Sequence, residues 1–428
     1  MKSSVSRAVT LVRWAGSFGR PLKSVCKKSR HYFSPHKKMK CLELFTGAGG
    51  LAMGIGKGGF EHDGLVEFNH DACETMRFNK SLKGSPLRDW NIHEADTRSI
   101  EDFGKKFKNV SLVAGGPPCQ PFSMGGKARG PEDPRDMFPE AIRAVRQTQP
   151  KAFIFENVKG LLREAFADYF EYIVLQMAYP TVVRKAAESE EEHRARLERI
   201  HTKGNVPDLN YRVVWQLLNA ADYGVPQKRE RVFFVGVRSD LHVAWTFPKP
   251  THSKAALDFT KFETGEYFEK HEVRKKERGE GVGFTLPASP RQRRLFEQEL
   301  ELKPWVTVRD AISDLEDPVK HPDEAFNHVH VPGARSYPGH TGSHIDEPAK
   351  TLKAGDHGVP GGENMVLFPN GSIRYFTLRE AARLQTFPDV YRFNRSWTES
   401  MRQLGNAVPV GLGEAVAHSV KTALDQLG

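Results

Sequence analysis

The sequence predicts an α/β protein with a mostly parallel, doubly wound sheet and a second, smaller domain. Short apolar runs of strand length alternate with helical patterns, and Gly- or Pro-rich turns end several of the runs. Strands that alternate with helices form parallel sheets, because each crossover helix returns the chain to the same end of the sheet. From about Trp245 the chain changes to Pro, His, Gly and charged residues with little periodicity, which predicts the second domain.

The expected strands are short apolar segments, several of them bounded by turn residues. They lie at residues 40–45, 65–68, 110–114, 152–155, 212–218 and 231–237, and we expect the last two to continue the alternation with helices.

Helices are expected between these strands and at the end of the chain. One should run to about Lys57 and another over residues 71–79. Residues 181–205 are dense in Glu, Arg and Lys, which predicts a solvated helical excursion on the surface. The last helix has an apolar stripe that recurs every four residues. Its members are Leu412, Val416, Val420 and Leu424.

The positive charge of the chain is concentrated at its N-terminal end. The formal net charge is +10, but ten of the 63 Lys and Arg residues lie in residues 1–38, which contain no Asp or Glu. The other 53 basic residues balance the 53 acidic ones. Residues 1–38 therefore predict a basic leader that is disordered, a targeting segment, a DNA-binding arm or a wrongly assigned start. The net charge is no evidence for a basic cleft in the rest.

The cysteines indicate neither a disulfide framework nor a zinc site. Cys26, Cys41, Cys73 and Cys119 show no Cys-x-x-Cys spacing. We therefore expect a reduced, intracellular protein. No apolar run approaches the length of a membrane span, so no membrane association is expected.

One segment stands out chemically: Pro117-Pro118-Cys119-Gln120-Pro121-Phe122-Ser123, which follows the apolar run at 110–114. Glu156 follows the apolar run at 152–155 in the same way. Because parallel strands end at the same edge of a sheet, the thiol and the carboxyl should lie close together. Such a pair can act as a nucleophile and a proton-handling partner. A buried small apolar residue is the alternative interpretation of Cys119.

This heptapeptide, with Glu156-Asn157-Val158 after it, resembles the catalytic core of the DNA (cytosine-5-)-methyltransferase family, of bacterial restriction–modification type. Other blocks resemble the family in its usual order, from Met39 to the C-terminus, and the likeness is weakest between about Trp245 and Tyr375. They are residues 44–51, 227–232, 378–388 and 403–409. The resemblance implies a Rossmann-like S-adenosylmethionine-dependent methyltransferase fold. It divides the chain into a catalytic domain at 39–244, a target-recognition domain at 245–375 and a returning segment at 376–428.

The Gly-rich turn after the first strand predicts a ligand site, because it lets backbone N–H groups approach a ligand at a helix N-terminus. Its spacing departs from the dinucleotide motif. Glu67 suits two ribose hydroxyls, whereas Asp96 suits an adenine amino group or a helix N-cap. The resemblance implies that the ligand is S-adenosylmethionine. The implied binding residues are Phe45, Gly47, Gly49, Gly50, Glu67, Phe68, Asp96, Pro118, Asn406, Ala407 and Val408.

The same resemblance implies the chemistry. C5 of cytosine is a poor nucleophile, so a thiolate of Cys119 adds to C6 and makes C5 enamine-like. A protonated Glu156 assists at N3 if burial raises the pKa of its carboxyl. Arg231, or else Arg229, hydrogen-bonds the base carbonyl, and Gln227 and Arg229 mainly shape the site. C5 then takes the methyl group, loses its proton and releases the cysteine.

A cytosine inside a stacked duplex cannot reach such a site, so the base must be flipped out of double-stranded DNA. Residues 124–130 are Gly-rich and predict a loop that closes over the substrate, with a plain surface loop as the alternative. Target choice is expected from residues 245–375, where His340, His344 and His357 could instead be structural or metal ligands. The expected DNA contacts are Ser123, Lys127, Arg129, His340, His344 and Lys353. The basic patches at 274–276 and 291–294 could neutralise phosphates or be ordinary solvated surfaces.

Three alternatives compete with a DNA methyltransferase. They are a tRNA methyltransferase of the same family, a catalytically silent DNA-binding regulator, and a nicotinamide-dependent oxidoreductase, which the glycine spacing disfavours. No metal is expected. We expect a monomer in the bacterial cytoplasm, paired with a restriction endonuclease without a stable complex, or an organellar location if residues 1–38 are a genuine transit peptide.

Overall fold

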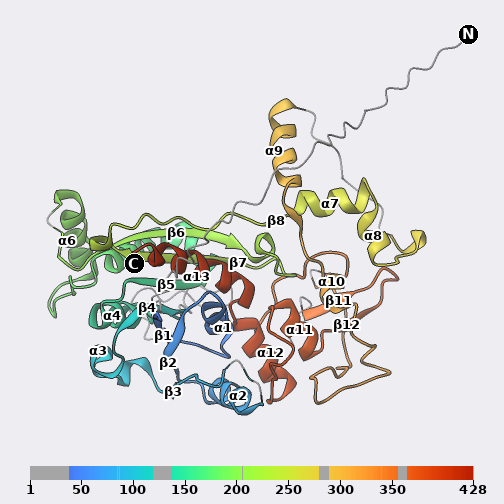
Figure 1. Ribbon diagram of the computed structural model, residues 1–428, viewed down its shortest axis with the longest axis horizontal. Helices are drawn as coiled ribbons and strands as arrows, with labels where there is room; N and C mark the ends of the chain where they lie inside the picture. Colours follow the sequence, from blue (N-terminus) through green and yellow to red (C-terminus); the bar gives the residue numbers. More distant parts are fainter. Residues whose placement is uncertain are drawn as a thin grey trace, which may run out of the picture. The chain divides into compact units, whose positions relative to one another are not determined.

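The central feature of the fold is a seven-stranded sheet. The computed structural model describes residues 38–83, 85, 87–118, 136–204, 206–278, 289–338, 340–354 and 364–427. The strand order is β3-β2-β1-β4-β5-β7-β6 (Figure 1). The strands are β1 (Lys40–Leu44), β2 (Glu61–Glu67), β3 (Ile92–Glu94), β4 (Val110–Gly115), β5 (Ala152–Val158), β6 (Tyr211–Asn219) and β7 (Glu230–Arg238). The expected α/β architecture is therefore correct.

The pairing is parallel from β3 to β5, whereas β7 runs antiparallel to both β5 and β6. The expectation that β6 and β7 continue the strand–helix alternation is wrong. Only residues 220–229 separate them, with a single 3₁₀ turn at Ala220–Tyr223. A parallel crossover needs a dozen residues or more, so this short connection produces an antiparallel pair.

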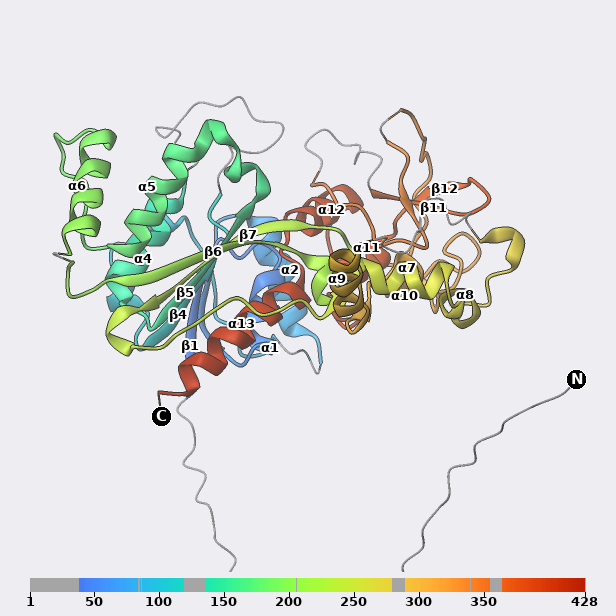
Figure 2. The ribbon, with the colours of Figure 1, turned by 90° about the horizontal axis from the view of Figure 1, so that it is seen from above.

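Helices cover both faces of the sheet (Figure 2). Successive strand residues point to opposite faces, so Leu42 and Phe153 contribute to one core and Cys41 and Ile154 to another. The first core includes α3 (Phe103–Lys106), α4 (Phe138–Thr148) and α5 (Ala167–Ala178), and the second includes α1 (Gly50–Lys57) and α13 (Val410–Asp425).

Helices α1 and α13 approach closely because α1 presents glycines every four residues. A Cβ atom at Gly54 would lie 2.7 Å from the carbonyl oxygen of Val410, and one at Gly58 would lie 2.6 Å from Cβ of Ala417. On α13, the predicted apolar stripe is buried as expected. The C-terminal helix is thereby fixed to the helix that begins at the Gly-rich turn.

The excursion predicted at 181–205 is helical. It contains α6 (Glu190–Lys203), which begins with a Ser189–Glu192 capping box. Leu197 is buried. Nε2 of His193 donates a hydrogen bond of 2.8 Å to the carbonyl of Val182, and its Nδ1 lies 2.8 Å from the hydroxyl of Tyr172. The excursion is therefore packed against α5 rather than being only a solvated surface.

Beyond Trp245 the described strands are only two or three residues long. A three-stranded sheet joins β10 (Ser343–His344), β11 (Met365–Leu367) and β12 (Ile373–Tyr375), and β8 (His252–Ser253) pairs with β9 (Lys303–Pro304). The helices here are α7 (Lys254–Phe262), α8 (Glu266–Lys270), α9 (Pro290–Leu300), α10 (Val308–Ile312), α11 (Leu378–Leu384) and α12 (Trp397–Asn406). From Lys38 onward the chain belongs to one compact unit, which is not divided at residue 244 or residue 375. The domain boundaries expected at these two positions therefore stay predictions.

Candidate active site

The ends of β4 and β5 lie side by side. Gly115, the last residue of β4, pairs with Phe155 of β5, and Glu156 is the next residue. The side-chain amide of Asn157 donates a hydrogen bond of 3.0 Å to the backbone carbonyl of Pro117. These contacts fix the backbone that leads directly into Cys119, which itself lies outside the described residues together with Ser123, Lys127 and Arg129.

The chain enters and leaves residues 119–135 at neighbouring points. The N–H of Met137 donates to the carbonyl of Pro118 at 3.2 Å. Asp136 accepts a hydrogen bond of 2.6 Å from the hydroxyl of Tyr169 on α5. The segment that contains Cys119 therefore begins and ends beside the edge that carries Glu156.

Glu156 and Arg231 form a nearly buried ion pair at this edge. Nε of Arg231 lies 2.8 Å from Oε1 of Glu156, and the side chains are 12% and 10% exposed. Burial raises the pKa of the Glu156 carboxyl, although the charges of Arg231 and Arg229 oppose that rise. The pair can therefore offer a flat polar substrate both a guanidinium donor and a carboxyl that binds a proton more readily than a free one.

Arg229 lies behind this pair and joins three parts of the chain. Its guanidinium is fully buried and donates to the carbonyls of Leu352 at 3.0 Å and Gly405 at 2.6 Å. Burial lowers the pKa of Arg229 well below its ordinary value. Backbone carbonyls thus bind both terminal nitrogens of the guanidinium, whereas its buried Nε has no hydrogen-bond partner among the described residues. The expectation that Arg229 mainly shapes the site stays a prediction.

Gln227 makes a similar connection. It is fully buried, its amide donates to the carbonyl of Leu384 at 3.1 Å, and its side-chain oxygen accepts from the N–H of Leu352 at 3.0 Å. A parallel bridge also joins Gln227 to Ala349. The 227–231 block is thus fastened to residues 349–352 and to α11.

A second group of predicted residues gathers where β1 and β2 end. Phe45 and Gly47 have positive φ angles of 56° and 58°. The carboxylate of Glu67, at the end of β2, is buried and accepts from the N–H groups of Gly47 at 2.7 Å and Asn69 at 2.8 Å. Burial raises its pKa, and these two backbone donors oppose the rise.

The surroundings of Glu67 leave room for a ligand. Apart from Gly47 itself and its two chain neighbours, no heavy atom of the described residues lies within 4 Å of the position that a Cβ of Gly47 would take. Phe68, next to Glu67, exposes 70% of its surface, which is unusual for an aromatic ring at the end of a buried strand. The turn, the carboxylate and the ring suit a ligand with hydroxyl groups and a flat aromatic part.

Asp96 has a different local role. It is the N-cap of the 3₁₀ turn Thr97–Ser99 and accepts from the N–H of Arg98 at 2.9 Å. The guanidinium of Arg98 binds both carboxylate oxygens, and these hydrogen bonds lower the pKa of Asp96. Asp96 is therefore a helix N-cap, as the alternative interpretation expected. Its carboxylate is still 37% exposed.

The C-terminal block packs directly on the Gly-rich turn. A Cβ at Gly50 would lie 2.5 Å from the carbonyl oxygen of Val408 and 3.1 Å from Cβ of Ala407. Gly49, with φ 81°, is the N-cap of α1, and Asn406 is exposed at the end of α12. Gly50 thus allows close packing, and the expected cofactor residues from both ends of the chain lie near one another.

The predicted DNA contacts in the later region have different local partners. His340 lies beside Tyr337, with ring centroids 4.8 Å apart. The backbone of Lys353 exchanges two hydrogen bonds with the buried side chain of Asn364, at 3.0 and 2.9 Å. Nδ1 of His344 accepts from the N–H of Asp346 at 3.2 Å.

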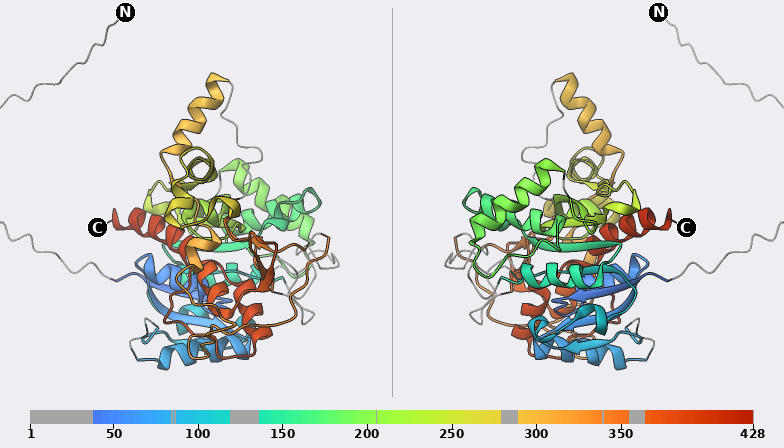
Figure 3. Two further views of the ribbon diagram at one scale, coloured as in Figure 1. Left: turned by 90° about the vertical axis from the view of Figure 1, so that its right-hand side faces the viewer. Right: turned by 90° about the vertical axis from the view of Figure 1, so that its left-hand side faces the viewer.

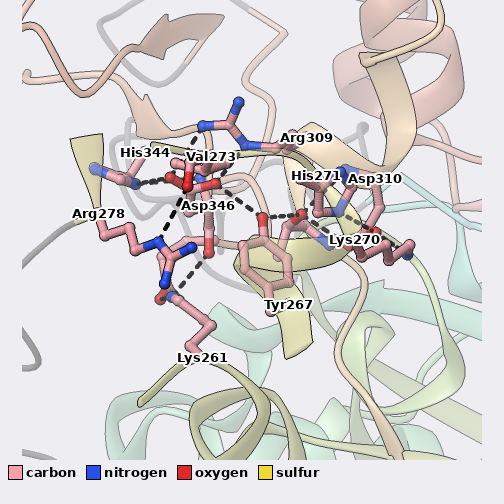
Figure 4. A network of polar contacts seen from close by, with 12 residues as sticks. Lys261, Tyr267, Lys270, His271, Val273, Arg278, Arg309, Asp310, His344 and Asp346 are labelled. Carbon is pink, nitrogen blue, oxygen red and sulfur yellow. Dashed lines mark hydrogen bonds and ion pairs between the residues drawn. The ribbon is translucent and has the colours of Figure 1, made fainter. Parts of the chain in front are cut away.

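His344 belongs to a polar network that supports this region (Figure 4). Asp346 is buried and accepts from Arg309 at 2.6 Å and from the Tyr267 hydroxyl at 2.9 Å. Lys261 donates to the carbonyl of Asp346 at 2.9 Å and to Glu347 at 2.7 Å. The network connects α7 and α8 to the segment that continues to Ala349, and so to the 227–231 block.

Several positioning residues were not assigned from the sequence. Asn157 belongs to the Glu156-Asn157-Val158 motif, so the sequence could have indicated that it is important. Tyr391, whose hydroxyl donates to the carbonyl of Ala48 at 2.7 Å, and Asn364 showed none, because their partners are distant in sequence. Within the described ranges no cluster of His, Cys, Asp and Glu suits a metal ion, and no helix is long and apolar enough to cross a membrane.

The comparison with known protein families covers all the sequence blocks that resemble the methyltransferases. The family model described as C-5 cytosine-specific DNA methylase matches residues 39–179 and 191–422. The chain belongs to this family. The methylase is therefore an enzyme of the DNA (cytosine-5-)-methyltransferase class, and the resemblance in its motifs is confirmed. The unmatched residues 180–190 lie at the start of the α6 excursion.

Bacterial Type II methyltransferases are among the proteins similar to this chain. The Type II methyltransferase M.NgoMIV of Neisseria gonorrhoeae is 32% identical over 387 residues, which cover 90% of this chain and 97% of that protein. M.Eco47II of Escherichia coli is 31% identical and covers 90% and 79%. Among solved structures, S. pombe Dnmt2 methyltransferase is 17% identical with a TM-score of 0.52 and covers 91% of this chain and 100% of that one. This last likeness supports the Rossmann-like methyltransferase fold.

Proposed function

We propose that the methylase transfers a methyl group from S-adenosylmethionine to C5 of a cytosine flipped out of a specific duplex DNA sequence, through a covalent bond between Cys119 and C6. The observation that carries the proposal is the buried Glu156–Arg231 pair, in which Oε2 of Glu156 lies 3.1 Å from the position that a Cβ of Gly116 would take, two residues before Pro118. A carboxyl with a raised pKa and a guanidinium, next to the segment containing a thiol, are the groups that activation of a cytosine ring requires.

Each residue has a stated role in the proposal. The thiolate of Cys119 adds to C6, and the electron density that reaches N3 is balanced by a proton from Glu156. Arg231 hydrogen-bonds the base carbonyl and holds Glu156 in place. The sulfur is eliminated again when the proton on C5 is lost, so the enzyme regains its free thiol.

The residues at the ends of β1 and β2 fit S-adenosylmethionine, which supplies an electrophilic methyl group when bound. Glu67 would accept hydrogen bonds from the ribose hydroxyls, and Phe68 and Phe45 would cover the adenine. The open space beside Gly47 and the exposed ring of Phe68 support this assignment. Pro118 and Gly49, together with Asn406, Ala407 and Val408, would complete the pocket.

Target recognition is proposed for residues 245–375, with His340, His344 and Lys353 as DNA contacts and with Ser123, Lys127 and Arg129 beside the nucleophile. The bacterial Type II relatives support a restriction–modification role, in the bacterial cytoplasm and with an endonuclease that acts on the same site. A monomer suffices for this chemistry because the proposed residues all come from one chain.

Transfer of a labelled methyl group to duplex DNA and to tRNA tests the reaction. Label on duplex DNA is expected, and label on tRNA alone would replace the proposal by the RNA methyltransferase of the same family. Bisulfite sequencing of DNA from cells expressing the methylase would then identify the target sequence.

A 5-fluorocytosine duplex tests the covalent step, because fluorine at C5 prevents the elimination. The native protein should form a stable adduct, and Cys119→Ser should form none while it still binds the duplex. Equal DNA binding by both proteins with no adduct from either would favour a catalytically silent regulator.

A further inference from the structure

Helix α9 projects from the rest of the described chain (Figures 1 and 3). It is attached at its C-terminal end, where the Ser253 hydroxyl donates to the carbonyl of Glu299 at 2.7 Å. Its N-terminal end begins with Ser289 as N-cap, and none of its residues is buried. With 11 residues, the helix is about 16 Å long, so its first turn stands well away from the attachment.

The charges of α9 are divided between its two ends. Arg291, Arg293 and Arg294 are exposed in the first half, and Glu297 and Glu299 are exposed in the second half. The macrodipole of a helix is positive at the N-terminus and therefore favours the opposite distribution. Core packing therefore does not account for three exposed arginines at the end of α9 that lies away from its attachment.

Their position does suit a polyanion. Outside residues 1–38 the Lys and Arg residues only balance the Asp and Glu residues, so attraction to DNA must come from local clusters. The three arginines form such a cluster, at the end of an arm that is about as long as five base pairs of duplex. Guanidinium groups bind phosphate oxygens with two parallel hydrogen bonds.

We propose that the α9 arm, defined as residues 290–300, binds the phosphate backbone of duplex DNA that flanks the methylated site. This inference rests on the proposed function for the identity of the substrate. The arm contacts phosphates and no base edges, so it increases affinity for long duplexes without changing the recognised sequence. Its contribution is electrostatic and is lost as the salt concentration rises.

The test compares Arg291→Gln/Arg293→Gln/Arg294→Gln with a matched control, Lys185→Gln/Arg199→Gln/Lys203→Gln, in the excursion around α6. The control removes the same charge from exposed positions. Binding to duplexes of about 14 and about 40 base pairs is measured by fluorescence anisotropy over a range of salt concentrations. Circular dichroism confirms that both variants are folded.

On the long duplex, a plot of the logarithm of the binding constant against the logarithm of the salt concentration should be less steep for the arm variant than for the native protein. The difference in slope should be up to about 2.7, which is the value for three phosphate contacts. On the short duplex, binding and methylation should be unchanged. Arg291→Lys/Arg293→Lys/Arg294→Lys should retain the slope, because it retains the charge.

An equal slope for the arm variant and the native protein on both duplexes would overturn the inference. This result is also the one expected if α9 binds an acidic protein instead of DNA. So would an equal loss in the control. If the native protein methylates tRNA and not duplex DNA, the proposed function fails instead, and the two failures are thereby distinguished.

Discussion

Nε of Arg231 and Oε1 of Glu156 lie 2.8 Å apart on two antiparallel strands, at an edge where both side chains are nearly buried. In the register of β5 and β7, Arg231 is opposite Val158 and Glu156 is opposite Phe233. The two charged side chains are therefore diagonal neighbours on one face of the sheet. Each group determines how the other can be protonated and where it can point.

The first prediction concerns Glu156→Gln. If a protonated Glu156 assists at N3, the substitution should lower kcat by about 10²- to 10⁴-fold, the usual range for general acid–base catalysis. Since burial raises the pKa of Glu156, the native rate should fall as pH rises through that raised value, because the required proton is lost. Initial rates of methyl transfer to duplex DNA across pH check both points. A native profile without this decrease would contradict the proposed role.

The second prediction concerns Arg229→Met. The substitution leaves the buried carbonyls of Leu352 and Gly405 without their donor, and each unsatisfied group costs about 1–3 kcal/mol. The free energy of unfolding in urea should therefore decrease by about 2–6 kcal/mol. Arg199→Met, at an exposed site on α6, is the control and should change it by less than about 0.5 kcal/mol. Similar values for the two variants would contradict a structural role for Arg229.

The third prediction separates two glycines of the same turn. Gly50→Ala places a Cβ 2.5 Å from the carbonyl oxygen of Val408, so the C-terminal block must move away from the turn. Gly47→Ala meets no neighbouring atom and adds only the strain of a positive φ, about 1–2 kcal/mol. Thermal unfolding should show a larger loss for Gly50→Ala. The reverse order would mean that the turn is not packed against residues 407–408.

The fourth prediction concerns Phe68→Ala. Because the ring is 70% exposed, its loss should change the free energy of unfolding by less than about 0.5 kcal/mol. Stacking of a base on an aromatic ring contributes about 1–3 kcal/mol, so the Kd for S-adenosylmethionine should rise about 5- to 150-fold. Calorimetric titration measures the Kd, and Phe78→Ala, another exposed aromatic residue, is the control. An unchanged Kd would remove Phe68 from the pocket.

The elements that could be predicted from the sequence are those with local signals. The strands β1, β4 and β5 are short, mostly apolar segments, and α13 has a regular apolar stripe. The pairing direction of β6 and β7 was missed because apolar runs show where strands are but not how they pair. The connection between them was short enough to indicate the answer.

The same distinction holds for the site. Glu156, Glu67 and Arg231 lie at strand ends that local patterns identify, so their residues could be proposed before the structure was known. The partners of Arg229 are backbone carbonyls more than a hundred residues away in sequence, at Leu352 and Gly405. No local pattern encodes such contacts. Asp96 is both an N-cap and an exposed carboxylate, and sequence spacing alone did not separate these two roles.

The reversed direction of β7 has a consequence for how the active edge tolerates change. Residues that end β5 and residues that begin β7 reach this edge from opposite directions, so the register of the hydrogen-bond ladder between the strands sets their spacing. A two-residue slip of β7 would preserve which side chains face each core and would still carry Arg231 about 7 Å along the strand, away from Glu156. The register of the ladder therefore sets the distance between Glu156 and Arg231, and a slip of this kind would remove the activity that we propose for the pair.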